Sequence, residues 1–85
     1  MTGPNGVVPA ELRHRHLELL ARRASAASDT AVAEIEDEIA VVCDQLADAL
    51  YPHDELLGGL ALHAAEYWRD RAAETRGRFE AGGAQ

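Results

Sequence analysis

The chain has 85 residues, a formal net charge of −7 and one cysteine. A chain of this length can bury one small core, which excludes a second domain, and the single thiol of Cys43 excludes both an internal disulfide and a zinc site built from several cysteines. No run reaches the roughly 18 to 20 apolar residues of a membrane span, and the N-terminus lacks the regions of a signal peptide, so we expect a cytoplasmic protein.

The charges are unevenly distributed along the chain. Residues 1–28 carry a net charge of +2, residues 29–57 carry −9 with no arginine or lysine, and residues 58–85 are neutral. Every basic residue apart from histidine is arginine, and the absence of lysine excludes Schiff-base chemistry and the lysine of a phosphate-binding P-loop. The acidic balance argues against direct nucleic-acid binding. No glycine-rich phosphate loop or nucleophile elbow is present, so we expect no enzymatic activity and no cofactor.

The first third of the chain predicts a leader followed by a helix. Residues 1–8 contain two glycines and one proline and are expected to be a flexible leader. Residues 9–26 lack glycine, and Pro9 suits the first position of a helix. The apolar side of this helix is expected to run through Leu12, Leu19 and Leu20, with Leu17 to one side.

The second predicted helix covers residues 30–50. Ser28, Asp29 and Thr30 are residue types that cap helix N-termini, so they predict the turn before it. Its apolar residues recur in steps of three and four, which is a heptad seam: Val32, Ile35, Ile39, Val42, Leu46 and Ala49. A neighbouring ridge of small residues, Ala33, Ala40 and Ala47, would let a second helix approach closely.

The third predicted helix begins at His53, Asp54 and Glu55 and ends near Arg78. Pro52 is expected to end the preceding helix by restricting Tyr51 to non-helical backbone angles. The expected buried arc of this helix is Leu56, Leu57, Leu60, Ala61, Ala64, Tyr67, Trp68 and Ala72. Gly58 and Gly59 lie within it and mark either a kink or a close backbone approach. We therefore predict an all-α fold, a helical hairpin plus a third helix in one domain over residues 9–80, with a disordered tail at 81–85.

Such a bundle has few aromatic residues and a small core, so we expect it to associate as a homodimer, through the heptad seam of the second helix or the stripe of Leu56, Leu60 and Tyr67. A larger protein partner is also possible on composition. The candidate partner-binding residues lie on the third helix, because tryptophan, tyrosine and arginine are enriched at interface hot spots. They are Tyr67, Trp68, Arg71, Arg78 and Phe79.

A second candidate surface is the acidic face of the second helix. Its members are Glu34, Asp37, Glu38, Asp44 and Asp48. Glu34 with Glu38, and Asp44 with Asp48, are like-charge pairs four residues apart, which destabilise an isolated helix. The face is therefore expected to meet solvent, arginines of the other helices, or a basic partner.

A metal site is the third candidate. Glu11 and His14 have the Glu-x-x-His spacing of carboxylate-bridged di-iron bundles, and Glu38 could add a ligand. Arg13 beside the pair would repel a cation, so we expect no bound metal. The predicted function is a non-catalytic helical accessory or adaptor protein that acts through helix–helix contacts. The alternatives are a metal-binding bundle, either an oxidoreductase or a storage protein, and an acidic antitoxin-like or DNA-mimicking inhibitor.

Overall fold

The computed structural model describes residues 8–83, which form three α-helices and no strand. Helix α2 spans Ala10–Ala24, α3 spans Asp29–Leu50 and α4 spans Glu55–Gly83. This confirms the predicted all-α three-helix bundle. Residues 1–7 of the predicted leader and residues 84–85 of the predicted tail lie outside the described part of the chain.

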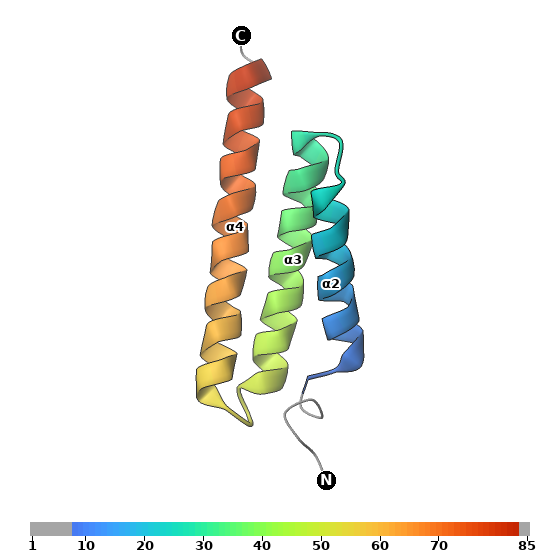
Figure 1. The fold of residues 1–85 in the computed structure, drawn as a ribbon. Helices are drawn as coiled ribbons and strands as arrows, with labels where there is room; N and C mark the ends of the chain where they lie inside the picture. The colour runs from blue at the N-terminus through green and yellow to red at the C-terminus, as the bar shows by residue number, and fades with distance from the viewer. Residues whose placement is uncertain (1–7, 84–85) are drawn as a thin grey trace.

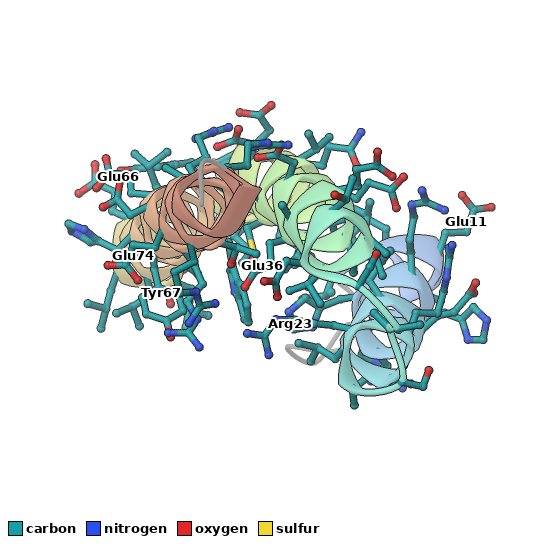
Figure 2. All side chains as sticks on the ribbon, turned by 90° about the horizontal axis from the view of Figure 1, so that it is seen from above. Glu11, Arg23, Glu36, Glu66, Tyr67 and Glu74 are labelled. Carbon is teal, nitrogen blue, oxygen red and sulfur yellow. The ribbon has the colours of Figure 1, made fainter. Side chains whose placement is uncertain are left out.

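The helices lie side by side in a curved row with α3 in the middle, and α2 and α4 both run antiparallel to α3 (Figures 1 and 2). The Cα atoms extend over 57, 22 and 12 Å along the three principal axes, so the row is much thinner than it is long or wide. The bundle is therefore one layer of helices with two broad faces. Arg23, Glu36 and Tyr67 all lie on the inner face of the curve, as Figure 2 shows.

The predicted turn between α2 and α3 is confirmed. Ser28 is the residue before α3, and its hydroxyl oxygen accepts a hydrogen bond from the Ala31 amide at 3.1 Å. This satisfies one of the amides that every helix start leaves without a partner. Helix α2 begins one residue after Pro9, whose carbonyl accepts bonds from the Leu12 and Arg13 amides.

The turn between α3 and α4 differs from expectation at Tyr51. The prediction that Pro52 keeps Tyr51 out of helical geometry is wrong, because Tyr51 has φ −51° and ψ −45°. Its amide still donates to the Ala47 carbonyl, and the His53 and Asp54 amides both donate to Leu50, which holds the chain in a helical turn past the end of α3. Asp54 then caps α4, accepting bonds from the Leu56 and Leu57 amides at 3.0 and 3.1 Å.

The core between α2 and α3 follows the predicted heptad seam. Ile35, Ile39 and Val42 are buried on α3 and pack with Leu19, the one buried residue of α2. The other three residues of the seam, Val32, Leu46 and Ala49, are half-buried. The seam that we considered for self-association is instead the core of the monomer.

The predicted buried arc of α4 is only partly right, because Ala61, Trp68 and Ala72 face α3 but its four largest apolar members apart from Trp68 do not. Leu56, Leu57, Leu60 and Tyr67 are 71%, 41%, 56% and 54% exposed. The residues of α4 that face α3 are smaller on average and recur in steps of three and four: Gly58, Ala61, Ala65, Trp68, Ala72 and Thr75.

The alanine ridge of α3 explains why the smaller residues of α4 face α3. Ala33, Ala40 and Ala47 are at most 3% exposed. On the α3 surface they lie between Glu36, which binds Thr75 of α4, and Asp37, which pairs with Arg76 of α4, so the ridge faces α4. A flat ridge of small side chains packs best against other small side chains at close range. The larger leucines are therefore left on the outer sides of α4.

Gly58 is required by a close approach. A Cβ atom added there would lie 2.7 Å from Cγ and 2.9 Å from Cα of Tyr51. At Gly59 the nearest atom would be the Tyr51 hydroxyl at 3.9 Å, an ordinary contact. The sequence left two interpretations of Gly58 and Gly59, a kink or a close backbone approach. The close approach applies at Gly58.

Helix α4 continues to Gly83, beyond the predicted end at Arg78 and through residues 81–83 of the predicted tail. Residues 78–83 contain no proline, and glycine costs only about 1 kcal/mol relative to alanine in a helix, which a continuing helix tolerates.

Candidate interaction surface

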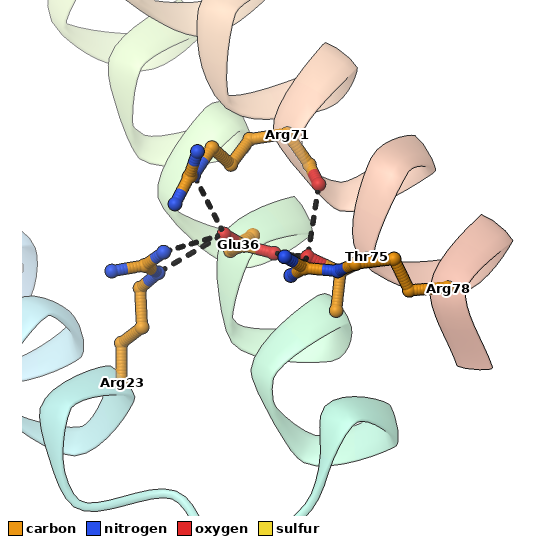
Figure 3. Close-up of polar contacts among 5 residues, drawn as sticks. All are labelled: Arg23, Glu36, Arg71, Thr75 and Arg78. Atoms are coloured by element: carbon orange, nitrogen blue, oxygen red, sulfur yellow. Dashed lines mark hydrogen bonds and ion pairs between the residues drawn. The ribbon is translucent and has the colours of Figure 1, made fainter. Parts of the chain in front are cut away.

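A buried carboxylate joins all three helices on the inner face. Glu36 of α3 is 0% exposed. Arg23 of α2 places Nε and a terminal nitrogen each 3.0 Å from Glu36 Oε2, and the Thr75 hydroxyl of α4 lies 2.7 Å from Oε1 (Figure 3). Arg71 Nε lies 3.7 Å from Oε2. We call these four residues, together with Arg78, the Glu36 cluster.

Local structure sets each member of the cluster in place. Arg23 is in the last turn of α2, where a cation interacts favourably with the helix dipole. Arg71 and Thr75 are one turn apart on α4, and the Thr75 hydroxyl also lies 3.0 Å from the Arg71 carbonyl. Its single proton serves one acceptor at a time, and the carboxylate is the stronger one. Arg78 donates to the Thr75 hydroxyl oxygen at 3.5 Å.

Aromatic side chains border the cluster. The Arg23 guanidinium lies 5.2 Å from the centre of the Trp68 ring, within the range of a cation–π interaction. Trp68 in turn meets Tyr67 edge to face, with ring centres 5.2 Å apart. Trp68 is half-buried against the core, whereas Tyr67 is exposed. Trp68 therefore belongs both to the core and to the surface.

Four of the five predicted partner-binding residues can be located in detail. Arg71 contacts Glu36 and Arg78 contacts Thr75. Trp68 joins them through Arg23, and Tyr67 contacts Trp68. The side chain of Phe79 lies outside the described residues. Sequence reasoning missed Glu36, Thr75 and Arg23, and these three make the closest contacts of the cluster.

The exposed side of α4 that adjoins the cluster has its own heptad spacing. Its positions advance in alternating steps of three and four along the helix, next to the small residues that face α3. We call this row the outer seam of α4, where outer means that the row does not face α3. Its members are Leu57, Leu60, Ala64, Tyr67, Arg71, Glu74 and Arg78. Its first half is apolar and its second half is charged.

The acidic face of α3 is largely paired within the chain. Asp37 pairs with Arg76 and Asp44 with Arg69, both arginines of α4. The bond to Asp37 raises the pKa of the Arg76 guanidinium. Glu38 pairs with Arg15 of α2 at 3.9 Å, while Glu34 and Asp48 are exposed. Arginines of the flanking helices thus offset the like-charge repulsion along α3.

The candidate metal ligands do not form a three-ligand group among the described side chains. His14 lies 3.7 Å from Glu18, and Glu38 faces Arg15 rather than His14. Glu11 is exposed at the start of α2. Among the side chains described for residues 8–78, no group of three or more histidine, cysteine or acidic residues is arranged to hold a metal ion.

Comparison with known proteins adds no relative. No family model, no curated protein and no solved structure matches this chain. None of the helices in the described range is long and apolar enough to cross a membrane. The cytoplasmic location, the absence of enzymatic activity and the absence of a cofactor stay predictions.

Proposed function

We propose that this chain is a non-catalytic interaction module that binds a helix of another protein along the outer seam of α4. The observation that carries the proposal is the heptad spacing of exposed apolar side chains on that seam. Leu57, Leu60 and Tyr67 are between 41% and 56% exposed. Scattered surface leucines are ordinary, but a row at heptad spacing has the pattern into which a second helix packs its own side chains.

The surroundings of the seam support the same proposal. Trp68 and Arg71 adjoin the apolar row, and these residue types dominate the energetics of protein interfaces. The Glu36 cluster fixes α4 to both α3 and α2, so the seam is presented by a helix that is held on one side. A rigid surface loses less conformational entropy on binding.

The predicted homodimer is the version of this proposal in which a second copy occupies the seam. It would bury the same leucines. Sedimentation of the purified chain across a concentration series distinguishes it from binding to a different protein, because only self-association makes the apparent mass rise with concentration.

The test uses partner capture by the immobilised full-length chain from extracts of its native host. The double variant Leu57→Gln and Leu60→Gln should lose at least tenfold in captured partner with an unchanged melting temperature. The matched control is Leu62→Gln, which alters a leucine that is 39% exposed on a different side of α4. Equal loss in the control, or no loss in the double variant, would remove the outer seam from consideration.

A further inference from the structure

The division of the outer seam into two halves constrains the partner. From Leu57 to Tyr67 the seam is apolar over about 15 Å, and from Arg71 to Arg78 it is charged over about 10 Å, at 1.5 Å per residue. A helix that lies along the whole seam therefore meets apolar side chains with one part and charged side chains with the other.

The arginines of the charged half are incompletely matched inside the chain. Both oxygens of Glu36 already have closer partners, because Arg23 contacts one of them at 3.0 Å with two nitrogens and Thr75 contacts the other at 2.7 Å. Arg71 reaches the same carboxylate only at 3.7 Å, and among the side chains that the structure describes Arg78 contacts the uncharged Thr75 hydroxyl.

Other arginines of α4 differ from these two. Arg69 and Arg76 each have an aspartate of their own on α3. Glu74 is the one acidic residue on the outer seam, so the charged half keeps a net positive charge in a chain whose overall charge is −7. Positive charge next to an exposed apolar row favours an occupant with negative charge.

A second copy of this chain fits the seam poorly in either direction. In a parallel pair, Arg71 and Arg78 of one copy would meet the same residues of the other, bringing two net positive ends together. In an antiparallel pair with the whole seams overlapped, Arg78 of each copy would lie against Leu57 of the other and Arg71 against Ala64. In the parallel arrangement each copy offers only Glu74 to two arginines on the seam, and in the antiparallel arrangement arginines are desolvated against apolar side chains, which is costly.

Resting on the function proposed above, we infer that the partner is an amphipathic helix of a different protein, apolar at heptad spacing over one part and acidic over the next, whose carboxylates bind Arg71 and Arg78. Arginine suits this role because its planar guanidinium can donate two parallel hydrogen bonds to one carboxylate. The apolar part supplies the buried area and the acidic part fixes the direction of the bound helix.

The experiment uses two synthetic peptides of four heptads with leucine at the a and d positions of the first two heptads. In the last two heptads the a and d positions are glutamate in one peptide and lysine in its twin, and neither peptide contains an aromatic residue. Trp68, the only tryptophan of the chain, lies beside the seam and reports binding to the full-length protein by its fluorescence. We expect the glutamate peptide to bind at least tenfold more tightly than the lysine peptide at low salt.

Variants connect that preference to named residues. Arg78→Gln changes an exposed side chain and should reduce the preference without altering the melting temperature. Arg78→Glu should shift it towards the lysine peptide, and Leu60→Gln should weaken both peptides alike.

The outcomes separate the two proposals. Equal affinity for the two peptides, or a preference for lysine in the unaltered protein, would overturn the acidic partner while leaving helix binding in place. A concentration-dependent dimer that requires Leu60 would replace the foreign helix by a second copy and also overturn it. Binding of neither peptide would contradict helix docking on this seam altogether.

Discussion

The two ends of the α3–α4 pair are held together in different ways. Near the turn between α2 and α3, the Glu36 carboxylate joins three helices through directional polar contacts. Near the turn between α3 and α4, Gly58 lets α4 approach Tyr51 closely, and the neighbouring leucines remain exposed. The first end depends on particular functional groups, whereas the second depends on the absence of a side chain, so the two ends should fail under different substitutions.

The largest effect is expected at Glu36. Glu36→Ala leaves the Arg23 guanidinium without its partner in a partly buried position, and removing one member of a buried ion pair costs about 3 to 5 kcal/mol. Chemical denaturation followed by circular dichroism measures this loss of unfolding free energy. Glu34→Ala, on the exposed side of the same helix, is the control and should change stability by less than about 0.5 kcal/mol. Similar values for both variants would show that the cluster contributes nothing specific.

Thr75→Val tests the second contact of the same carboxylate. Valine keeps the volume and shape of threonine but leaves a buried Glu36 oxygen without its donor, which costs about 1.5 to 3 kcal/mol. Thr75→Ser retains the hydroxyl and should recover most of that loss. If serine and valine were equally destabilising, the methyl group rather than the hydrogen bond would be the important part of Thr75.

The opposite end is tested by two adjacent glycines. Gly58→Ala places a methyl group within 3 Å of Tyr51, including its backbone, so we expect destabilisation of about 1 to 2 kcal/mol after the gain in helix propensity. Gly59→Ala has room for its methyl and should stabilise the protein by up to about 1 kcal/mol. Thermal melts of the two variants should therefore shift in opposite directions, and shifts of the same sign would contradict the close approach at Gly58.

Cys43 lies between the two ends. The alkylation rate of its thiol should report opening of the bundle without affecting the stability of the bundle. The thiol is 3% exposed, and burial raises its pKa while Arg69 acts more weakly in the opposite direction. Because only the thiolate is nucleophilic, alkylation near pH 8 should be slower in the folded protein than in denaturant. Glu36→Ala should speed the reaction more than Gly59→Ala does, as followed by mass spectrometry. Equal rates in folded and denatured protein would place the thiol at the surface.

The sequence predicted α3 well because its bulky seam and its capping serine are local signals. It predicted only part of the buried face of α4, because α4 carries two adjacent heptad rows and hydropathy ranks Leu57 and Leu60 above Gly58 and Ala65. The outcome depends on the neighbour, since the alanine ridge of α3 selects small side chains opposite it. That ridge was recognisable in the sequence and could have indicated the small-residue row of α4.

The sequence contained a weaker signal for the Glu36 cluster than for the helices. Glu36 shares a heptad position with Cys43 and Leu50, so it is a single charge within an otherwise apolar register of α3. Its partners lie 13 residues earlier and 39 residues later in the chain. Spacing within one helix carries no information about such distant partners, which is why the cluster became visible only in three dimensions.

The order of the helices in the row has a consequence for how the chain folds. The main interfaces join α2 with α3 and α3 with α4, so each helix packs against its neighbour in the sequence. Contacts between segments close in sequence require little loop closure in the transition state, and helical proteins of low contact order fold in microseconds to milliseconds. The ion pair between Arg23 and Glu36 spans the short turn between α2 and α3, whereas the bond from Thr75 to Glu36 closes a loop three times as long in sequence. Neither interface needs the other to bring its helices together, whereas the contact of Arg23 with Trp68 joins α2 to α4 and is made only when both helices are packed on α3.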